Sequence, residues 1–242
     1  TISGVISGVG GSLTKTGTGT LTLSGVNTYT GTTTVNNGII QGTLPTNTAL
    51  TVTSPGVYNL NAPRTIGSLA GNGNVTLNTF TLTTGGLNTS PTYSGVLSGT
   101  GGLTKVGTGT LTLSGANTFT GTTAITNGAI TLTGSLGGAV NVSAARTFNV
   151  NGATLTAANP VTNNGTTNFN TTGSAAAATI VNNAGGTVSI SGTTAPGTTI
   201  GSLSGAGNVA LGARTLTTGG LNTSDTISGV ISGVGGSLTK TG

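Results

Sequence analysis

The most constraining feature of this sequence is a segment that occurs twice without change. TISGVISGVGGSLTKTG occupies residues 1–17 and again residues 226–242, so the sequence begins to repeat itself after residue 225. The simplest interpretation is one period of a longer array with an overlap into the next copy. A closed barrel or sandwich cannot be lengthened by further copies. A stack of coils can, because each coil contacts only its neighbours.

A second level of repetition lies inside this period. Residues 1–38 align with residues 92–128 with one deletion, and residues 65–90 align with residues 199–224. The period is therefore expected to hold two sub-repeats of unequal length. We predict sub-repeat A at residues 1–91, sub-repeat B at residues 92–225 with an Asn- and Ala-rich insertion at about 140–186, and the start of the next copy at 226–242.

Short apolar segments within each sub-repeat alternate with period two. LTLSG, AITLTG and TVSISG place Leu, Ile or Val at every second position, which is the spacing of a strand with one buried face. SG, NG and GG turn signals follow every few residues. The nearest approach to a helix, SAAAATI at residues 174–180, is too short to be one. At ~20 residues per coil and ~4.8 Å between coils, one period predicts about 11 coils and roughly 50 Å of fibre.

The composition excludes most catalytic chemistry. The chain has one acidic residue, Asp225, and no His or Cys. A pair of carboxylates, a Ser-His-Asp triad and a structural zinc or iron–sulfur site are all impossible. Asp225 alone cannot supply the oxygen ligands of calcium. We therefore expect no catalytic, cofactor-binding or metal-binding residue, and a protein that is not an enzyme. The Gly-rich GSLAGNG and GSLSGAG segments lack a P-loop Lys and are interpreted as turns.

The basic balance does not indicate a nucleic-acid partner. The net charge is +5, but the Lys and Arg residues lie far apart along the sequence rather than in a cluster. No run approaches the ~18 apolar residues of a membrane span, so we expect no membrane insertion by this segment and a targeting signal only outside it. Disorder is disfavoured because the apolar residues are regularly placed.

One motif resembles a known family. The segment LTKTGTGTLTLSGVNTYTGTTTVNNG, residues 13–38, is similar to the autotransporter-associated β-strand repeat, also called the passenger-associated transport repeat, and residues 103–128 form a second copy. The resemblance implies an all-β, right-handed parallel β-helix (a β-solenoid) in the exported passenger region of a large bacterial surface protein. It implies an extracellular or cell-surface location. The export route is inferred from the resemblance.

Several repeat positions have predicted structural roles. Leu21 and Leu23, with their counterparts Leu111 and Leu113, should point inward and stack on adjacent coils, each burial contributing about 1.5–3 kcal/mol. We expect the glycines that follow at the strand ends to supply positive φ angles or tight corners. These glycines are Gly25 and Gly115.

Asparagines, aromatics and lysines recur at equivalent positions in the two sub-repeats. The asparagines beside turns should bond their local backbone or form ladders, with sugar binding as the alternative. Tyr29 and Phe119 should pack over a corner, with exposed adhesive aromatics as the alternative. Lys15, Lys105 and Lys240 are expected to be solvated; a covalent Lys–Asn crosslink is the alternative, although no acid lies nearby in sequence. The asparagines are Asn27, Asn117, Asn37 and Asn127.

These features predict an extracellular structural shaft or filament that binds itself head-to-tail through adjacent repeats. An adhesin stalk whose flank contacts glycans or cell surfaces is the alternative. Ice binding by Thr-x-Thr pairs such as Thr20/Thr22, Thr81/Thr83 and Thr110/Thr112 needs a constant coil spacing, and the sequence spacing is irregular. A β-helix enzyme such as a polysaccharide lyase is disfavoured by the lack of His and acids. The two identical segments favour one giant chain over separate subunits.

Overall fold

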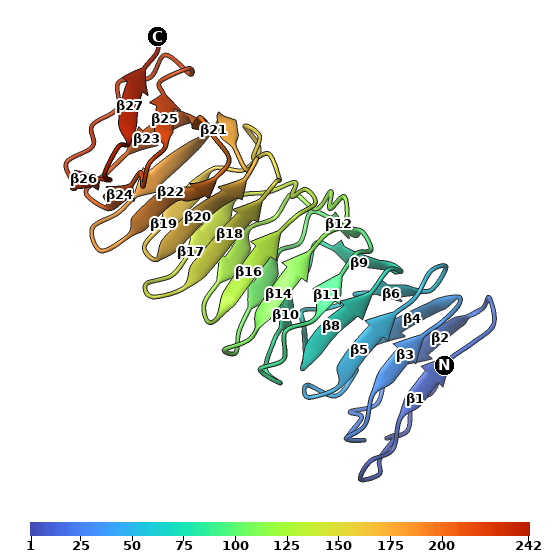
Figure 1. The fold of residues 1–242 in the computed structure, drawn as a ribbon. Helices are drawn as coiled ribbons and strands as arrows, with labels where there is room; N and C mark the ends of the chain where they lie inside the picture. Colours follow the sequence, from blue (N-terminus) through green and yellow to red (C-terminus); the bar gives the residue numbers. More distant parts are fainter.

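The chain winds into a rod of stacked coils. The computed structural model describes all 242 residues and contains strands but no helix. Every strand pairing is parallel, and the N- and C-terminal residues lie at opposite ends of the rod (Figure 1). No segment forms a helix that is long and apolar enough to cross a membrane. The predicted all-β, parallel β-solenoid is confirmed, and its roughly 12 turns agree with the expected ~20 residues per coil.

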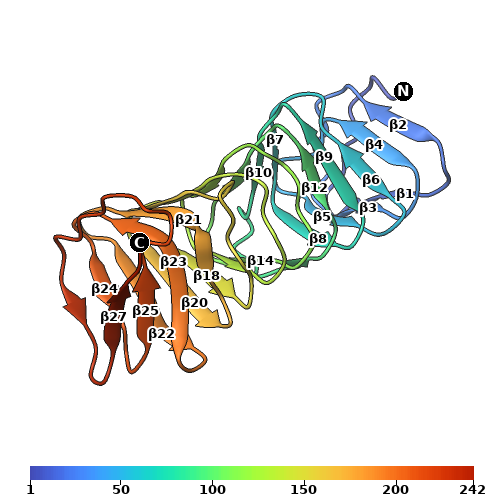
Figure 2. The same ribbon diagram turned by 90° about the horizontal axis from the view of Figure 1, so that it is seen from above.

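Three sheets form the sides of the rod (Figure 2). A coil contributes at most one strand to each sheet, and only the twelve-stranded sheet runs from one end of the rod to the other. The twelve-stranded sheet contains β1 (Leu13–Lys15), β3 (Thr33–Val35), β5 (Ala49–Val52), β8 (Ser68–Gly71), β11 (Thr92–Tyr93), β14 (Thr110–Leu113), β16 (Ala129–Leu132), β18 (Thr147–Asn151), β20 (Thr166–Thr171), β22 (Thr187–Thr193), β24 (Asn208–Ala210) and β26 (Ile231–Ser232).

The other two sheets are shorter. The ten-stranded sheet contains β7 (Arg64–Ile66), β10 (Leu82–Thr84), β13 (Leu103–Lys105), β15 (Thr123–Ile125), β17 (Val140–Val142), β19 (Val161–Asn163), β21 (Ala175–Asn182), β23 (Gly197–Ser204), β25 (Thr215–Thr218) and β27 (Ser237–Lys240). The five-stranded sheet contains β2 (Thr20–Leu23), β4 (Ile39–Gly42), β6 (Val57–Asn59), β9 (Asn74–Asn78) and β12 (Leu97–Gly99).

Coils differ in their number of residues, and the extra residues lie in the corners between strands. The coil that brings Leu50 opposite Thr33 is shorter than the coil that brings Ile231 opposite Val209. The strands nevertheless stay in register, since a slip of one residue would turn every apolar side chain outward. The Asn- and Ala-rich insertion at about 140–186 forms further coils of the same kind, from β17 onward. SAAAATI, which showed no helical stripe of useful length, lies largely within β21.

The two copies of the repeat motif lie on different sides of the rod. The Leu-Thr-Lys segment is β1 of the twelve-stranded sheet in sub-repeat A, but β13 of the ten-stranded sheet in sub-repeat B. The following strand moves in the same way, from the five-stranded sheet (β2) to the twelve-stranded sheet (β14). The five-stranded sheet ends at β12 because the corner at 115–121 then occupies that side.

The core is a continuous apolar column. It contains 41 buried residues, mostly Leu, Ile and Val from alternate strand positions. The predicted inward leucines are confirmed: Leu23, Leu111 and Leu113 are buried, and Leu21 packs against the same core. Leu111 stacks on Ile130 and Leu113 on Leu132 of the next coil. Burial of such columns supplies the hydrophobic free energy that a chain with few charges needs.

Of the two roles expected for the corner glycines, the structure confirms the tight corner and not the positive φ. Gly25 and Gly115 are not among the positive-φ residues. A Cβ at Gly115 would instead collide with the carbonyl oxygen of Gly95 on the preceding coil, and one at Gly25 would meet that of Gly4. Gly134 stands in the same relation to Gly115. Backbones of successive coils therefore approach too closely at this corner for any side chain.

Candidate functional site

Acidic and metal-ligating side chains do not cluster in this structure. No group of three or more His, Cys, Asp or Glu residues could hold a metal ion. The single carboxylate, Asp225, accepts hydrogen bonds from the Ser202 hydroxyl (2.7 Å), the Thr223 hydroxyl (3.1 Å) and the Leu203 amide (3.3 Å). Its oxygens therefore organise a turn. The polar groups with specific geometry are the repeat-position lysines, asparagines and tyrosines.

Two of the three lysines are buried, so the prediction that they are solvated is wrong for Lys15 and Lys105. Lys105 is 1% exposed and Lys15 is 8% exposed. The Lys105 Nζ donates hydrogen bonds to the carbonyl oxygens of Val106 (2.6 Å), Gly107 (2.9 Å) and Asn127 (3.4 Å). The first two belong to the turn after β13, and the third belongs to the next coil. We call this arrangement the lysine turn.

The same arrangement surrounds the other lysines of the repeat. The Lys15 Nζ donates to the carbonyl oxygens of Thr16 (3.0 Å), Gly17 (2.5 Å) and Asn37 (3.2 Å). Lys240 is exposed and makes only the first two of these bonds, to Thr241 (2.7 Å) and Gly242 (3.0 Å). The lysine turn is therefore a property of the repeat, and its third bond needs a following coil.

In the lysine turn, the ammonium supplies hydrogen bonds to backbone carbonyls that would otherwise lack a donor in the protein. The carbonyls of Val106, Gly107 and Asn127 have no other hydrogen-bond donor in the protein. Gly107 has a φ of +69°, which favours glycine and turns its carbonyl toward the ammonium. Burial lowers the pKa of Lys105 below its usual range. The hydrogen bonds offset part of the desolvation of the charge.

A Lys–Asn crosslink does not fit this geometry. The ammonium of Lys105 contacts the main-chain oxygen of Asn127, while the side-chain oxygen of Asn127 accepts a hydrogen bond from the Gly128 amide (2.9 Å). The same holds for Asn37 and Gly38 (2.7 Å). The expectation that Asn37 and Asn127 bond their local backbone is confirmed. Their role is to shape the turn that faces the lysine.

Asn27 and Asn117 join three successive coils. Asn117 is 2% exposed; its Oδ1 accepts a hydrogen bond from the Leu97 amide (3.0 Å), and its Nδ2 donates to the Ser135 carbonyl (3.0 Å). Asn27 makes the equivalent bonds to Ile6 (2.9 Å) and Thr43 (2.7 Å). Both ends of each amide are occupied, so these side chains are not free to bind a sugar.

Asparagine ladders are present, but they do not involve the four asparagines for which they were considered, and most of them lie in the insertion. Side-chain amides pair between neighbouring coils at 2.7–2.9 Å. Four pairs lie in the insertion, Asn149–Asn168, Asn151–Asn170, Asn163–Asn182 and Asn164–Asn183, and a fifth, Asn59–Asn78, lies in sub-repeat A. These ladders satisfy polar groups without charge. They therefore give the Asn-rich composition of this stretch a structural cause.

Tyr29 and Phe119 pack inside a corner, as predicted. They are 2% and 0% exposed. The Tyr29 hydroxyl lies 2.6 Å from the Thr33 hydroxyl, which lies 2.9 Å from that of Thr48. Phe119 has no hydroxyl, and the hydroxyl of Thr123, the counterpart of Thr33, has no hydrogen-bond partner. Burial raises the pKa of Tyr29, Tyr58 and Tyr93.

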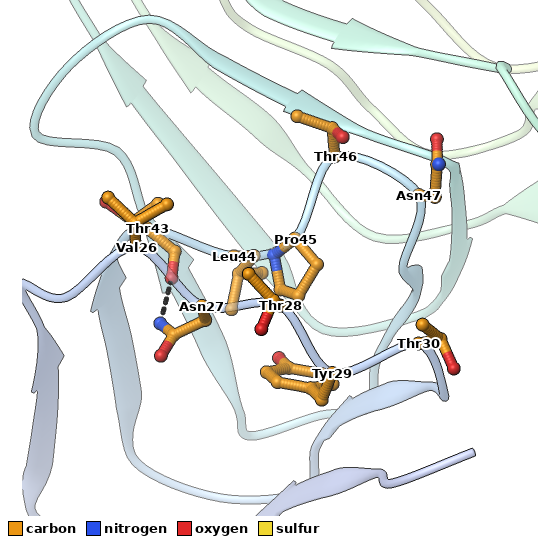
Figure 3. Close-up of a pocket in the computed structure, with 10 residues that line it drawn as sticks. All are labelled: Val26, Asn27, Thr28, Tyr29, Thr30, Thr43, Leu44, Pro45, Thr46 and Asn47. Atoms are coloured by element: carbon orange, nitrogen blue, oxygen red, sulfur yellow. Dashed lines mark hydrogen bonds between the residues drawn. The ribbon is translucent and has the colours of Figure 1, made fainter. Parts of the chain in front are cut away.

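A shallow pocket opens beside Tyr29 (Figure 3). It has a volume of about 340 Å³ and lies between the corner at 26–30 and the next coil at 43–47. Val26, at its rim, is 72% exposed. The lining carries no charge and exposes more apolar than polar surface, with Val26, Leu44 and Pro45 beside hydroxyl groups, so it offers contacts suited to an uncharged, partly apolar molecule. No sequence pattern indicates this pocket, because it depends on the loop at residues 43–47, which differs from its counterpart in sub-repeat B.

The fold and these polar groups define a repeat protein: a β-solenoid whose recurring polar side chains join one coil to the next. The repeat itself can be named. A scan against protein families matches residues 13–41 and 103–133 to the passenger-associated transport repeat. The chain therefore contains two passenger-associated transport repeats, as the resemblance indicated. These repeats in a β-solenoid fit an autotransporter passenger domain, and the family suggests a secreted or cell-surface protein.

Searches of curated proteins and of solved structures found no match to the chain.

Proposed function

We propose that this chain is a segment of an extracellular shaft or filament of a giant repetitive bacterial surface protein. One observation carries the proposal: strands pair in parallel with strands of adjacent coils from one end of the rod to the other. Such a rod grows by adding coils and needs no change of fold. The lysine turns and asparagine bonds link each repeat to its neighbours, which suits a part that must stay extended.

The experiment is a measurement of length. A chain with two units in tandem, residues 1–225 followed by residues 1–242, should form a single rod about 50 Å longer than the 242-residue chain in electron micrographs. The 242-residue chain is the matched control. A tandem chain that folded back on itself, or formed two particles joined by a linker, would contradict the shaft. Antibody labelling of intact producing cells tests the surface location.

The second candidate is an adhesin stalk with a glycan-binding flank. The uncharged pocket beside Tyr29 favours it. This candidate predicts saturable binding of neutral glycans by the isolated chain, weakened by a bulky residue at the exposed Val26, such as Val26→Trp. If the chain bound nothing on a broad glycan array, the adhesin stalk would be contradicted and the shaft would remain as the proposed function. Ice binding has less support, because Thr20/Thr22 stack on Ile39/Gln41 and not on another threonine pair.

A further inference from the structure

The segment TISGVISGVGGSLTKTG occurs at residues 1–17 and 226–242, and its two copies pair with different neighbouring coils. Residues 1–17 are covered only by the coil that follows them: β1 pairs with β3, and the Thr28 amide donates to the Ile6 carbonyl (2.9 Å). Residues 226–242 are covered only by the coil that precedes them, through the β24–β26 and β25–β27 pairings. Each copy of one sequence therefore has the neighbour that the other lacks.

The copy at residues 226–242 exposes apolar side chains, and its lysine lacks a hydrogen bond, whereas the equivalent groups in the middle of the chain are buried or bonded. Leu238 is 43% exposed and Ile231 is 38% exposed, whereas their counterparts in the middle of the chain, Leu103 and Leu97, are fully buried. Lys240 has two carbonyl partners where Lys105 has three. These are unpaired strand edges of the kind that proteins cover.

The middle of the chain contains the complete arrangement. LTTGGLNTS precedes the segment at residues 82–90 and again, unchanged, at residues 216–224. Leu82 lies opposite Leu103 and Thr84 opposite Lys105; in the same register, Leu216 lies opposite Leu238 and Thr218 opposite Lys240.

The pairing with the following coil is also the same in the two sub-repeats. Leu103 lies opposite Thr123, as Leu13 lies opposite Thr33. The internal boundary between sub-repeats is therefore an assembled copy of the boundary that two successive units would form.

We propose that the edge formed by β24 and β25 is a docking site for residues 1–17 of a second copy of this chain. We call this edge the junction edge. The second copy docks with Leu13 opposite Leu216 and Lys15 opposite Thr218, and its lysine turn then has a coil on each side. In the single chain, residues 226–242 occupy the junction edge. This inference rests on the proposed shaft, and it adds the partner and the register.

Two equivalent glycines give a test with a built-in control. A Cβ at Gly229 would collide with the carbonyl oxygen of Gly207 on the junction edge. At Gly4, the same position of the first copy, no atom lies within 4 Å. Gly229→Val should thus displace residues 226–242 and open the junction edge. Gly4→Val should leave the single chain unchanged but prevent its residues 1–17 from docking on another chain.

The experiment measures mass in solution by light scattering. The wild-type chain should have a mass near 22.9 kDa. Gly229→Val should form concentration-dependent, open-ended oligomers in multiples of this mass, because head-to-tail contacts do not close. The double variant Gly4→Val/Gly229→Val should return to the monomer. Excess peptide of residues 1–17 should also return Gly229→Val to the monomer, and the same peptide with Gly4→Val should not.

Engineered cysteines report the register, and the natural chain has none to interfere. Thr217 lies opposite Thr239, the counterpart of Thr14. Thr14→Cys/Thr217→Cys in the Gly229→Val background should give a disulfide-linked ladder, since paired strands hold Cα atoms within disulfide range. The same cysteines without Gly229→Val should give at least tenfold less. Ser12→Cys/Thr217→Cys, two residues out of register, should also give little.

The outcomes separate the junction from the shaft. A folded Gly229→Val chain that stays monomeric would overturn the proposed junction, and so would oligomers that persist with Gly4→Val or lack the 14–217 crosslink. If Gly229→Val unfolds the whole chain, failure of the labelled 1–17 peptide to exchange onto the wild-type chain overturns it instead. The shaft depends separately on the length of the tandem chain.

Discussion

Replacing Lys105 by methionine removes a charge from the interior of the rod and keeps most of the side-chain volume. The two shorter bonds of the lysine turn, 2.6 and 2.9 Å, are charge-assisted, and each is worth about 1.5–3 kcal/mol. Their loss therefore costs about 3–6 kcal/mol. The variant recovers part of this because no ammonium has to be desolvated. We expect a net decrease of about 2 kcal/mol in the free energy of unfolding.

The assay is denaturant unfolding followed by circular dichroism, with Lys240→Met as the matched control. Lys240 is exposed and lacks the third carbonyl, so its replacement should change stability by less than about 0.5 kcal/mol. Lys105→Met with wild-type stability would refute the reasoning, because the ammonium would then contribute nothing that a thioether does not. A similar loss in both variants would refute it too, since burial would not be the cause.

Three further results are expected. Phe119→Tyr should stabilise the chain by about 1 kcal/mol, because its hydroxyl can reach the unpartnered Thr123 hydroxyl as Tyr29 does in sub-repeat A; a decrease in the denaturation midpoint would contradict this. Gly115→Ala should cost about 2 kcal/mol or more, whereas Gly86→Ala, with open space around it, should be nearly neutral in the same thermal melts. The free energy of unfolding should vary little between pH 4 and 9. Above about pH 10 it should fall by about 1.4 kcal/mol per pH unit for each buried tyrosine. The cause is that burial raises the pKa of these tyrosines, so the folded state holds more protons than the unfolded state in this range. Burial of Lys105 lowers its pKa and offsets part of that loss, and chemical denaturation at a series of pH values would measure the balance.

Much of the fold could be predicted from the sequence, because its determinants are local. Period-two patterning sets which side of a strand is buried, so Leu111 and Leu113 could be placed without coordinates. The repeats indicated a stack because they require an architecture that can be extended. The aromatic corner followed from the exchange of Tyr29 for Phe119 at one position.

The lysine turn could have been predicted from the same patterning. In Leu-Thr-Lys the lysine lies two positions after an inward leucine, so the period that buries Leu103 also buries Lys105. Lysine is usually exposed, but here the register buries it because three carbonyls lie within reach of its ammonium. The close approach at Gly115 depends on the backbone of the preceding coil, so no local pattern reveals it.

The position of each repeat around the rod depends on the sum of all coil lengths, and it has a consequence for function. Leu13 and Leu103 begin equivalent segments, yet they lie in different sheets, because sub-repeat A does not fill a whole number of coils. The chain passes through the ten-, twelve- and five-stranded sheets in turn, so the offset between sub-repeats is one side of the coil. A group on one side of sub-repeat A thus faces a different side in sub-repeat B. A shaft built in this way distributes its corners around the axis, and no single side carries all the lysine turns or all the close glycine contacts. Lateral features then recur on different sides along the rod, which disfavours sideways association through one continuous face while leaving end-on growth unaffected.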